Sequence, residues 1–444
     1  MDPQLSRIAE AARNRPSERM TSLIHLVDKQ RLWDAHLRMP SDKAVGVDGV
    51  TKAEYERELE ANLDDLMARM KRQAYKPKPS RRTYIRKENG DKRPLGIPSY
   101  EDKLVQKAMS QILNAIYEEK FLPCSYGFRP GRNQHQALQA LDHLIMKQGA
   151  RYIVDVDIKG FFNHVEHEWL RRFLEHDIAD PNFLRLIARF LKGGVMEDGA
   201  YQETEEGTPQ GGNLSPQLAN VYLHYALDLW FEKEIKGKKC RGRAGMVRYA
   251  DDFVCGFERE EEAEAFYEAL VERMGKFNLT LAEEKTKLIR FGYGAEVDCK
   301  RYGLSKPGTF DFLGFRHIWG KGKSGKYRLL RKTSPKKFRL RVKEMTQWVR
   351  ENRHMPEQML VDSVRRKLRG HYQYYGVSDN YFSLQRYYNA VLKAIWKWRN
   401  RRSQKRSFTV DKFKAFLARN PMPQPRIQVN LYASVKGNLK SRMP

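Results

Sequence analysis

Residues 247–254 of this chain read VRYADDFV, a hydrophobic strand that carries two adjacent acids, Asp251 and Asp252. Asp is a poor strand former, and two ionised carboxylates placed side by side repel each other. A bound cation would offset both costs, and Mg²⁺ favours carboxylate oxygens as ligands. The alternative is a β-hairpin whose turn holds the two acids. These residues alone leave both interpretations open.

A second acidic strand is predicted at residues 152–158, which read YIVDVDI. Strand alternation places Asp155 and Asp157 on one face and Val154, Val156 and Ile158 on the other. Two such strands side by side would form a shared carboxylate site, in which Asp157 and Asp251, assisted by Asp252, hold two Mg²⁺ ions. Two metal ions can activate an attacking hydroxyl and stabilise the leaving oxygens of an in-line displacement. This is the chemistry of nucleotidyl transfer.

The positive charge is concentrated at one end of the chain. The whole chain carries a net charge of +28, and residues 321–444 hold 32 Lys and Arg against 6 Asp and Glu, a net charge of +26. Such a field attracts polyphosphates, so the composition favours a nucleic-acid partner over a merely soluble basic surface.

Other global features exclude several classes of protein. No apolar run approaches the roughly 18–20 residues that span a membrane, so no membrane partner is expected. The four cysteines are widely spaced and form no CxxC pair, which argues against a zinc site and a disulfide framework. We expect a reducing, cytoplasmic setting.

The order of predicted elements indicates an α+β fold. Residues 1–75 form a helical extension in which Leu59, Leu63 and Leu66 follow helical spacing, and residues 76–320 alternate strands and helices. Residues 321–444 are basic and mostly helical, and glycines and lysines in 321–343 suggest a linker before the first helix. Nine aromatic residues lie between Tyr372 and Trp398. We expect most of them in a bundle core and about a third exposed for stacking on bases.

Three loops carry further candidates. A basic hairpin at 81–98 would supply Lys87 and Arg93 to a triphosphate, although a charge run usually means only a solvated face. The glycine-rich loop at 206–216 would let Gln210 lie against the incoming nucleotide, because glycines permit close backbone approach. Residues 126–132, YGFRPGR, form a rigid basic loop.

Eight ordered motifs resemble those of group II intron-encoded reverse transcriptases, also called maturases. The resemblance extends from about residue 20 to residue 432. The motifs are GVDGVT at 46–51, NGDKRPLGIP at 89–98, YGFRPGR at 126–132, DVDIKGFFNHVEH at 155–167, GTPQGGNLSPQLANVYL at 207–223, RYADDF at 248–253, EEKTKL at 283–288 and FDFLGF at 310–315.

The resemblance implies a right-hand polymerase fold, with fingers, a palm built on an antiparallel sheet, a helical thumb and a C-terminal helical maturase domain. It assigns metal binding to Asp157 rather than Asp155, and it matches Phe162 to the aromatic steric gate that rejects a ribose 2′-hydroxyl. Plain palm core is the alternative for Phe162. Positions that match nucleotide contacts are Lys87, Arg93, Gln210 and Lys285, the last with a surface lysine as the alternative.

The C-terminal match rests on LRGHYQYY at 368–375 and PMPQPRI at 421–427. It implies binding of structured intron RNA and help with splicing, besides an RNA template, a DNA primer and dNTPs. Nothing after about residue 432 supplies a cysteine- and histidine-bearing endonuclease domain, so target cleavage is not expected. The residues expected to contact nucleic acid are Arg129, Arg132, Lys336, Lys337, Arg365, Arg366 and Arg369.

Two other functions stay open at this point. The chain could act mainly as an RNA-binding splicing factor, with copying secondary. It could also be a domesticated polymerase used in phage defence, diversity generation or repair. The sequence QGGNLSP at 210–216 resembles the group II intron class of reverse transcriptases. It therefore favours a copying enzyme that also serves an intron over a domesticated polymerase.

Overall fold

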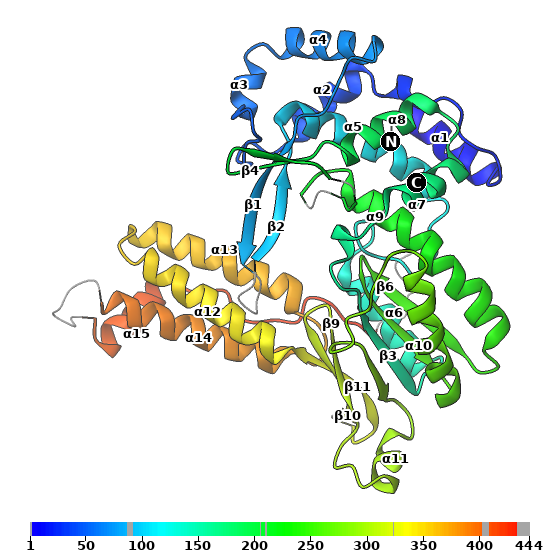
Figure 1. Cartoon of the computed structure of the whole chain (residues 1–444). Helices are drawn as coiled ribbons and strands as arrows, with labels where there is room; N and C mark the ends of the chain where they lie inside the picture. The colour runs from blue at the N-terminus through cyan, green and yellow to red at the C-terminus, as the bar shows by residue number, and fades with distance from the viewer. Residues whose placement is uncertain are drawn as a thin grey trace.

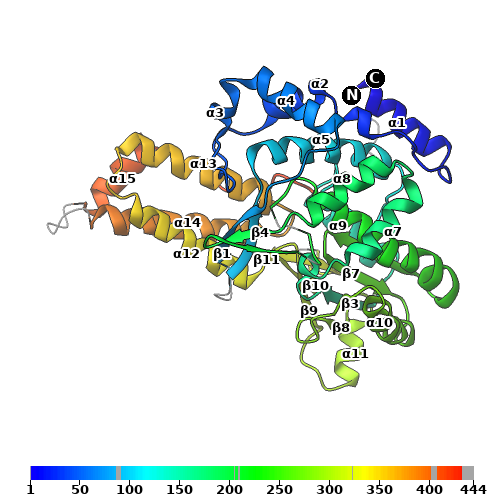
Figure 2. The same cartoon turned by 45° about the horizontal axis from the view of Figure 1, so that its top comes forward.

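The computed structural model describes residues 2–86, 92–204, 206–208, 211–322, 324–401 and 408–432. Figure 1 shows N-terminal helices at the top, a central sheet flanked by helices below them, and a C-terminal helix bundle at one side. The bundle still projects to that side in Figure 2, and in both views the first two strands extend toward it. The predicted mixture of helices and strands is confirmed, including a helical C-terminal region.

The N-terminal helices pack around one long helix. They are α1 (Pro3–Asn14), the 3-10 turn η1 (Ile24–Leu26), α2 (Lys29–Arg38), α3 (Lys52–Glu56), α4 (Leu59–Lys71) and the long helix α5 (Tyr100–Tyr117). Thr51 starts α3 with a capping box shared with Glu54. Leu59, Leu63 and Leu66 of α4 are buried, as their helical spacing predicts.

The predicted basic hairpin is confirmed. It consists of β1 (Ser80–Arg86) and β2 (Lys92–Ile97), which pair antiparallel. Two short strands, β4 (Val195–Glu197) and β5 (Ala200–Gln202), extend it into a four-stranded sheet of order β2-β1-β4-β5. The connection between β1 and β2, residues 87–91, lies outside the described part of the chain.

The central sheet is antiparallel, with strand order β6-β7-β3-β8. Its strands are β3 (Tyr152–Asp157), β6 (Ala244–Tyr249), β7 (Asp252–Phe257) and β8 (Lys287–Arg290). The two acidic segments therefore become the adjacent central strands β3 and β7. This arrangement brings the acids of the two segments together.

Helices surround this sheet. They are α6 (Gln134–Met146), the 3-10 turn η2 (Phe161–Asn163), α7 (His167–Asp177), α8 (Pro181–Leu191), α9 (Ser215–Leu223) and α10 (Glu260–Gly275). Helix α9 leads into two π-helical segments, η3 (His224–Asp228) and η4 (Phe231–Lys239).

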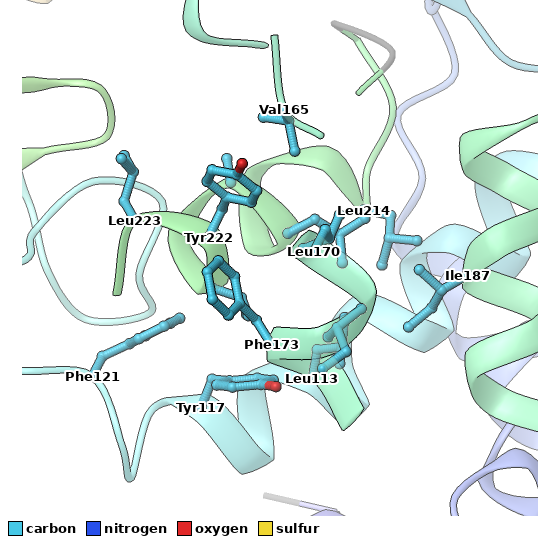
Figure 3. Packing of buried hydrophobic residues seen from close by; sticks show 14 of the residues in the cluster. Leu113, Tyr117, Phe121, Val165, Leu170, Phe173, Ile187, Leu214, Tyr222 and Leu223 are labelled. Atoms are coloured by element: carbon cyan, nitrogen blue, oxygen red, sulfur yellow. The ribbon is translucent and has the colours of Figure 1, made fainter. Parts of the chain in front are cut away.

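The sheet separates two hydrophobic cores. The first core contains Val154 and Phe253 from the sheet and runs without a break through α5 to Leu63 of α4. Figure 3 shows part of it, where Phe173 and Tyr222 pack together. The second core lies on the other face and joins Ile153 and Val254 to the C-terminal elements.

The C-terminal elements include a small sheet of order β11-β10-β9. In chain order these elements are α11 (Ala295–Arg301), β9 (Thr309–Phe312), β10 (Phe315–Lys321), β11 (Tyr327–Thr333), α12 (Pro335–Glu351), α13 (Glu357–Tyr375), α14 (Tyr381–Arg399) and α15 (Val410–Arg419). The predicted linker at 321–343 is wrong. Its glycines lie around the β10–β11 hairpin, and the rest of the segment forms β11 and the start of α12. Of the nine aromatic residues, three are exposed, namely Tyr381, Phe382 and Trp396.

Candidate active site

Strand pairing brings the acids of the two central strands together. Asp157, the last residue of β3, lies directly opposite Asp252, the first residue of β7. Residues opposed in this way point to the same face of a sheet, and Asp155 shares that face because it is two residues from Asp157. This is the face of the second core, since Val254 follows Asp252 at the same spacing.

Asp251 belongs to the turn rather than to a strand. Tyr249 of β6 pairs with Asp252 of β7, so Ala250 and Asp251 form a two-residue turn between them. Ala250 has a backbone φ of 59°, a left-handed conformation that is unusual for a residue other than glycine. The segment is therefore both a hairpin tip and part of an acid cluster.

The surroundings of these acids disfavour negative charge. Burial is the main cause that raises the pKa of Asp252 well above its ordinary range, followed by the charges of Asp155, Asp251 and Asp157. Burial also raises the pKa of Asp251, against the opposing charge of Arg93. Burial raises the pKa of Asp155 to about 7, and nearby Asp311 adds to the rise. A cation placed among these oxygens would offset the cost of ionising the carboxyl groups. The cluster therefore fits an ion that prefers oxygen ligands, such as Mg²⁺.

Lys285 is the present cationic partner of Asp157. Its Nζ lies 2.7 Å from Oδ2 of Asp157, and this hydrogen bond is the main cause that raises the pKa of Lys285. Both side chains are exposed to solvent, so burial does not hold this ion pair together. Among the described residues, no group of three or more His, Cys, Asp or Glu side chains is arranged to hold a metal ion. Proteins usually hold Mg²⁺ with one or two carboxylates, and the remaining oxygens come from substrate and water.

Phe162 borders a cavity that lies between η2 and the β1–β2 hairpin. It is the middle residue of the short helix η2, is half-buried, and stacks edge-to-face on the buried Phe161. The cavity has a volume of about 420 Å³, and its walls include Phe162, Gly96 and Thr208. Arg93, on β2, is exposed, and its positive charge lowers the pKa of Asp251. Lys87 and Gln210 lie outside the described residues.

The glycine-rich loop packs closely against protein backbone. Gly211 has a φ of 120°, and a Cβ there would lie 2.7 Å from the carbonyl oxygen of Gly96 on β2. Asn213 anchors the loop to α5, where Gln106 Oε1 accepts a hydrogen bond from its N–H at 2.8 Å. The close approach inferred from the glycines is real at Gly211, but the neighbour there is β2.

The basic loop at 126–132 requires a correction. Arg129 is buried, donates two hydrogen bonds from Nε to the carboxylate of Glu118, and reaches the carbonyl oxygens of Leu122 and Ser125. Arg132 is half-buried and donates to the carbonyl oxygens of Pro123 and Ser125. Both guanidinium groups therefore hold the loop together. Because Arg129 is buried, we withdraw it from the predicted nucleic-acid surface, whereas contact of the half-buried Arg132 with nucleic acid stays a prediction.

The C-terminal cations lie on α12 and α13. Lys336, Arg366 and Arg369 are exposed, while Lys337 and Arg365 are half-buried. Lys337 borders a cavity of about 620 Å³ that is also lined by Asp252, Arg341 and Lys367. Arg341 and Lys367 are not among the residues predicted from the sequence. Arg341 follows Lys337 by four residues and so shares its helix face, which is a signal that could have found it.

Comparisons with known proteins agree with these observations. Residues 85–317 match the family model described as reverse transcriptase (RNA-dependent DNA polymerase). Group II intron-encoded protein LtrA of Lactococcus lactis subsp. cremoris is 39% identical over 222 residues, which are 50% of this chain and 37% of that protein. Protein YkfC of Escherichia coli K12 is 31% identical over 360 residues, covering 73% of this chain and 90% of that protein. Nuclear intron maturase 2, mitochondrial, of Arabidopsis thaliana is 27% identical over 179 residues, 31% of this chain and 24% of that protein.

No described helix is long and apolar enough to cross a membrane.

Proposed function

Because this chain belongs to the reverse transcriptase (RNA-dependent DNA polymerase) family, we propose that Asp157, Asp251 and Asp252 form its two-Mg²⁺ polymerase site. The observation that carries this proposal is the pairing of Asp157 with Asp252 beside the turn that holds Asp251. Template, primer and dNTPs are the substrates that the family implies. When bound, two Mg²⁺ ions would activate the primer 3′-hydroxyl and stabilise the leaving pyrophosphate.

The chain's own residues orient the nucleotide around that centre. Lys285, released from Asp157, reaches the nucleotide phosphates, and Arg93 neutralises charge beside Asp251. Lys87 and Gln210 belong to the same set by their match to the family motifs. Positive groups placed in advance around the triphosphate stabilise the charge that develops during transfer.

The proposed domains follow the same family pattern. Residues 1–75 form an N-terminal helical extension, residues 76–320 form fingers and palm, and residues 321–444 form the thumb and maturase domain. Cations on α12 and α13 contact the template–primer duplex behind the acids, and they are Lys336, Lys337, Arg365, Arg366 and Arg369.

We further propose that the C-terminal region binds structured intron RNA and assists splicing and mobility. Its net charge of +26 and the similarity to a group II intron-encoded protein and a nuclear intron maturase support this role. The acids then serve copying alone. The C-terminal cations serve both functions, because they contact the template–primer duplex and the intron RNA.

The function is tested by primer extension. The purified chain is expected to extend a labelled DNA primer annealed to an RNA template when dNTPs and Mg²⁺ are present, and to stop when EDTA removes the metal. Gel resolution of the products measures the rate. A chain that binds the duplex but adds no nucleotide with either Mg²⁺ or Mn²⁺ would overturn the proposal.

Phe162→Ala is expected to lower discrimination against ribonucleotides by roughly 10- to 100-fold, because an alanine leaves room for the 2′-hydroxyl. The measurement compares kcat/KM for a dNTP and the matching rNTP. Phe382→Ala, which removes an exposed ring on α14, is the control and should keep the wild-type ratio. An unchanged ratio in Phe162→Ala would return this residue to plain core packing.

A further inference from the structure

A buried arginine holds the turn that carries Asp251. The Nε and Nη2 atoms of Arg248 donate to the two carboxylate oxygens of Asp228 at 2.7 and 2.5 Å. Its Nη1 donates to the Ala250 carbonyl oxygen at 2.9 Å and to Asn220 Oδ1 at 3.0 Å. The side chains of Arg248 and Asp228 are fully buried. One guanidinium therefore links the hairpin turn to the α9–η3 helical segment.

The π-helical segment η3 makes this double contact possible. Asn220 lies on α9 and Asp228 ends η3, eight residues later. In a regular α-helix these two side chains would point roughly 80° apart. The wider turns of η3 change that spacing, and both side chains reach the same guanidinium. Such π-helical insertions are frequent at functional sites.

The basic loop at 126–132 also packs against the turn. Asn220 Nδ2 donates to the carbonyl oxygen of Gly127 at 2.8 Å. A Cβ on Gly127 would lie 2.3 Å from the backbone nitrogen of Ala250, so only glycine fits there. The N–H of Tyr126 donates to the Arg248 carbonyl, and the N–H of Arg248 donates to the Cys124 carbonyl, both at 2.8 Å. The loop thus runs along the edge of β6 up to the turn.

The two arginines of the loop complete the support. Arg129 and Arg132 both donate to the carbonyl oxygen of Ser125, which lies between the two residues that hydrogen-bond to β6, Cys124 and Tyr126. Glu118, at the end of α5, anchors Arg129. Three sequence motifs, at 126–132, 207–223 and 248–253, therefore meet at one backbone turn.

We propose that Arg248, Asp228, Asn220 and Gly127 are positioning residues that hold Ala250 in its left-handed conformation and so fix the Asp251 carboxylate for metal binding. This inference rests on the proposed function. A left-handed alanine persists only where its surroundings hold it, and these four residues supply that restraint. Displacing a catalytic group by about 1 Å from outside the site can cost roughly 100-fold in rate.

Arg248→Lys tests the arginine directly. A lysine keeps the charge beside Asp228 but lacks the fork that reaches Asp228, Asn220 and Ala250 together. We expect the single-turnover rate to fall roughly 100-fold, with the half-saturating dNTP concentration within about threefold of wild type. The half-saturating Mg²⁺ concentration should rise. Mn²⁺ affinity, measured by electron paramagnetic resonance on a dideoxy-terminated primer–template complex with dNTP, should weaken in parallel.

Arg331→Lys is the matched control. Arg331 is also fully buried and pairs with an aspartate, Asp142 at 2.8 Å, but it lies on β11 outside the central sheet. Its substitution should lower the unfolding temperature without changing Mn²⁺ affinity. If both variants change metal affinity equally, or if neither does, the positioning role is wrong.

Gly127→Ala provides a second, independent variant, in which no charged side chain is altered. Its Cβ should displace Ala250 and weaken Mn²⁺ binding, whereas Gly275→Ala, where a Cβ meets nothing within 4 Å, should not. Gly127→Ala decides the question should Arg248→Lys fail to fold. A wild-type chain that never extends a primer would refute the proposed function. A wild-type chain that extends, with Gly127→Ala equal to it in rate and Mn²⁺ affinity, would refute this inference alone.

Discussion

Asp251→Asn is expected to reduce DNA synthesis by at least about 1000-fold, because the amide cannot supply a charged ligand to the metal ions. The same change should leave the unfolding midpoint unchanged or raise it. Burial raises the pKa of Asp251, so ionising this carboxyl costs more in the folded chain than in the unfolded chain, and the neutral amide removes that cost. Single-turnover extension with Mg²⁺ measures the first effect. Thermal unfolding at neutral pH without divalent ions measures the second.

Asp298→Asn is the control for this prediction. Asp298 is an aspartate of α11 that pairs with Arg151, and it should retain wild-type synthesis. Asp251→Asn should also keep its affinity for structured intron RNA and its stimulation of splicing, since it leaves every cation of α12 and α13 in place. Synthesis that survives in Asp251→Asn would refute the site assignment. Lost intron affinity would refute the separation of the two roles.

The triple variant Lys336→Ala, Arg366→Ala and Arg369→Ala is expected to weaken duplex binding roughly 100-fold at low salt. The exposed positions of these residues suit phosphate contacts. Each lost phosphate contact should make the plot of log affinity against log salt concentration less steep by about 1. Fluorescence anisotropy with a labelled RNA–DNA duplex, repeated across salt concentrations, measures the slope.

The control for the triple variant removes cations from a different face. Arg171 and Arg172 on α7 are exposed and pair with Glu175 and Glu168 along their own helix. Replacing both with alanine should leave the salt slope nearly unchanged. An equal loss in both variants would indicate a general effect of net charge, and would contradict a specific binding face on α12 and α13.

Local periodicity predicted the acid face of β3 correctly. Asp155 and Asp157 share a face because side chains alternate along any strand, and this needs no knowledge of neighbours. The face of Asp252 could not be predicted in the same way. It depends on where the hairpin turns, and a left-handed alanine gives no sequence signal comparable to that of glycine.

The role of the basic loop was unpredictable for a different reason. Exposed and buried arginines look alike in a sequence, and the partners of Arg129 are a distant glutamate and two backbone carbonyls. The linker prediction at 321–343 failed because glycines near a hairpin resemble those of a flexible connection. The places of Lys87 and Gln210 stay predictions, since both lie outside the described residues.

The continuity of the two cores limits how this chain can be dissected. The first core joins α2, α4 and α5 to the sheet, and the second joins the sheet to β10, α13 and α14. A fragment cut at residues 75 and 320 would therefore expose apolar surface on both sides of the sheet, and exposed surface of this kind promotes aggregation. The boundaries visible in the sequence are boundaries of composition. The unit that folds extends across both of them.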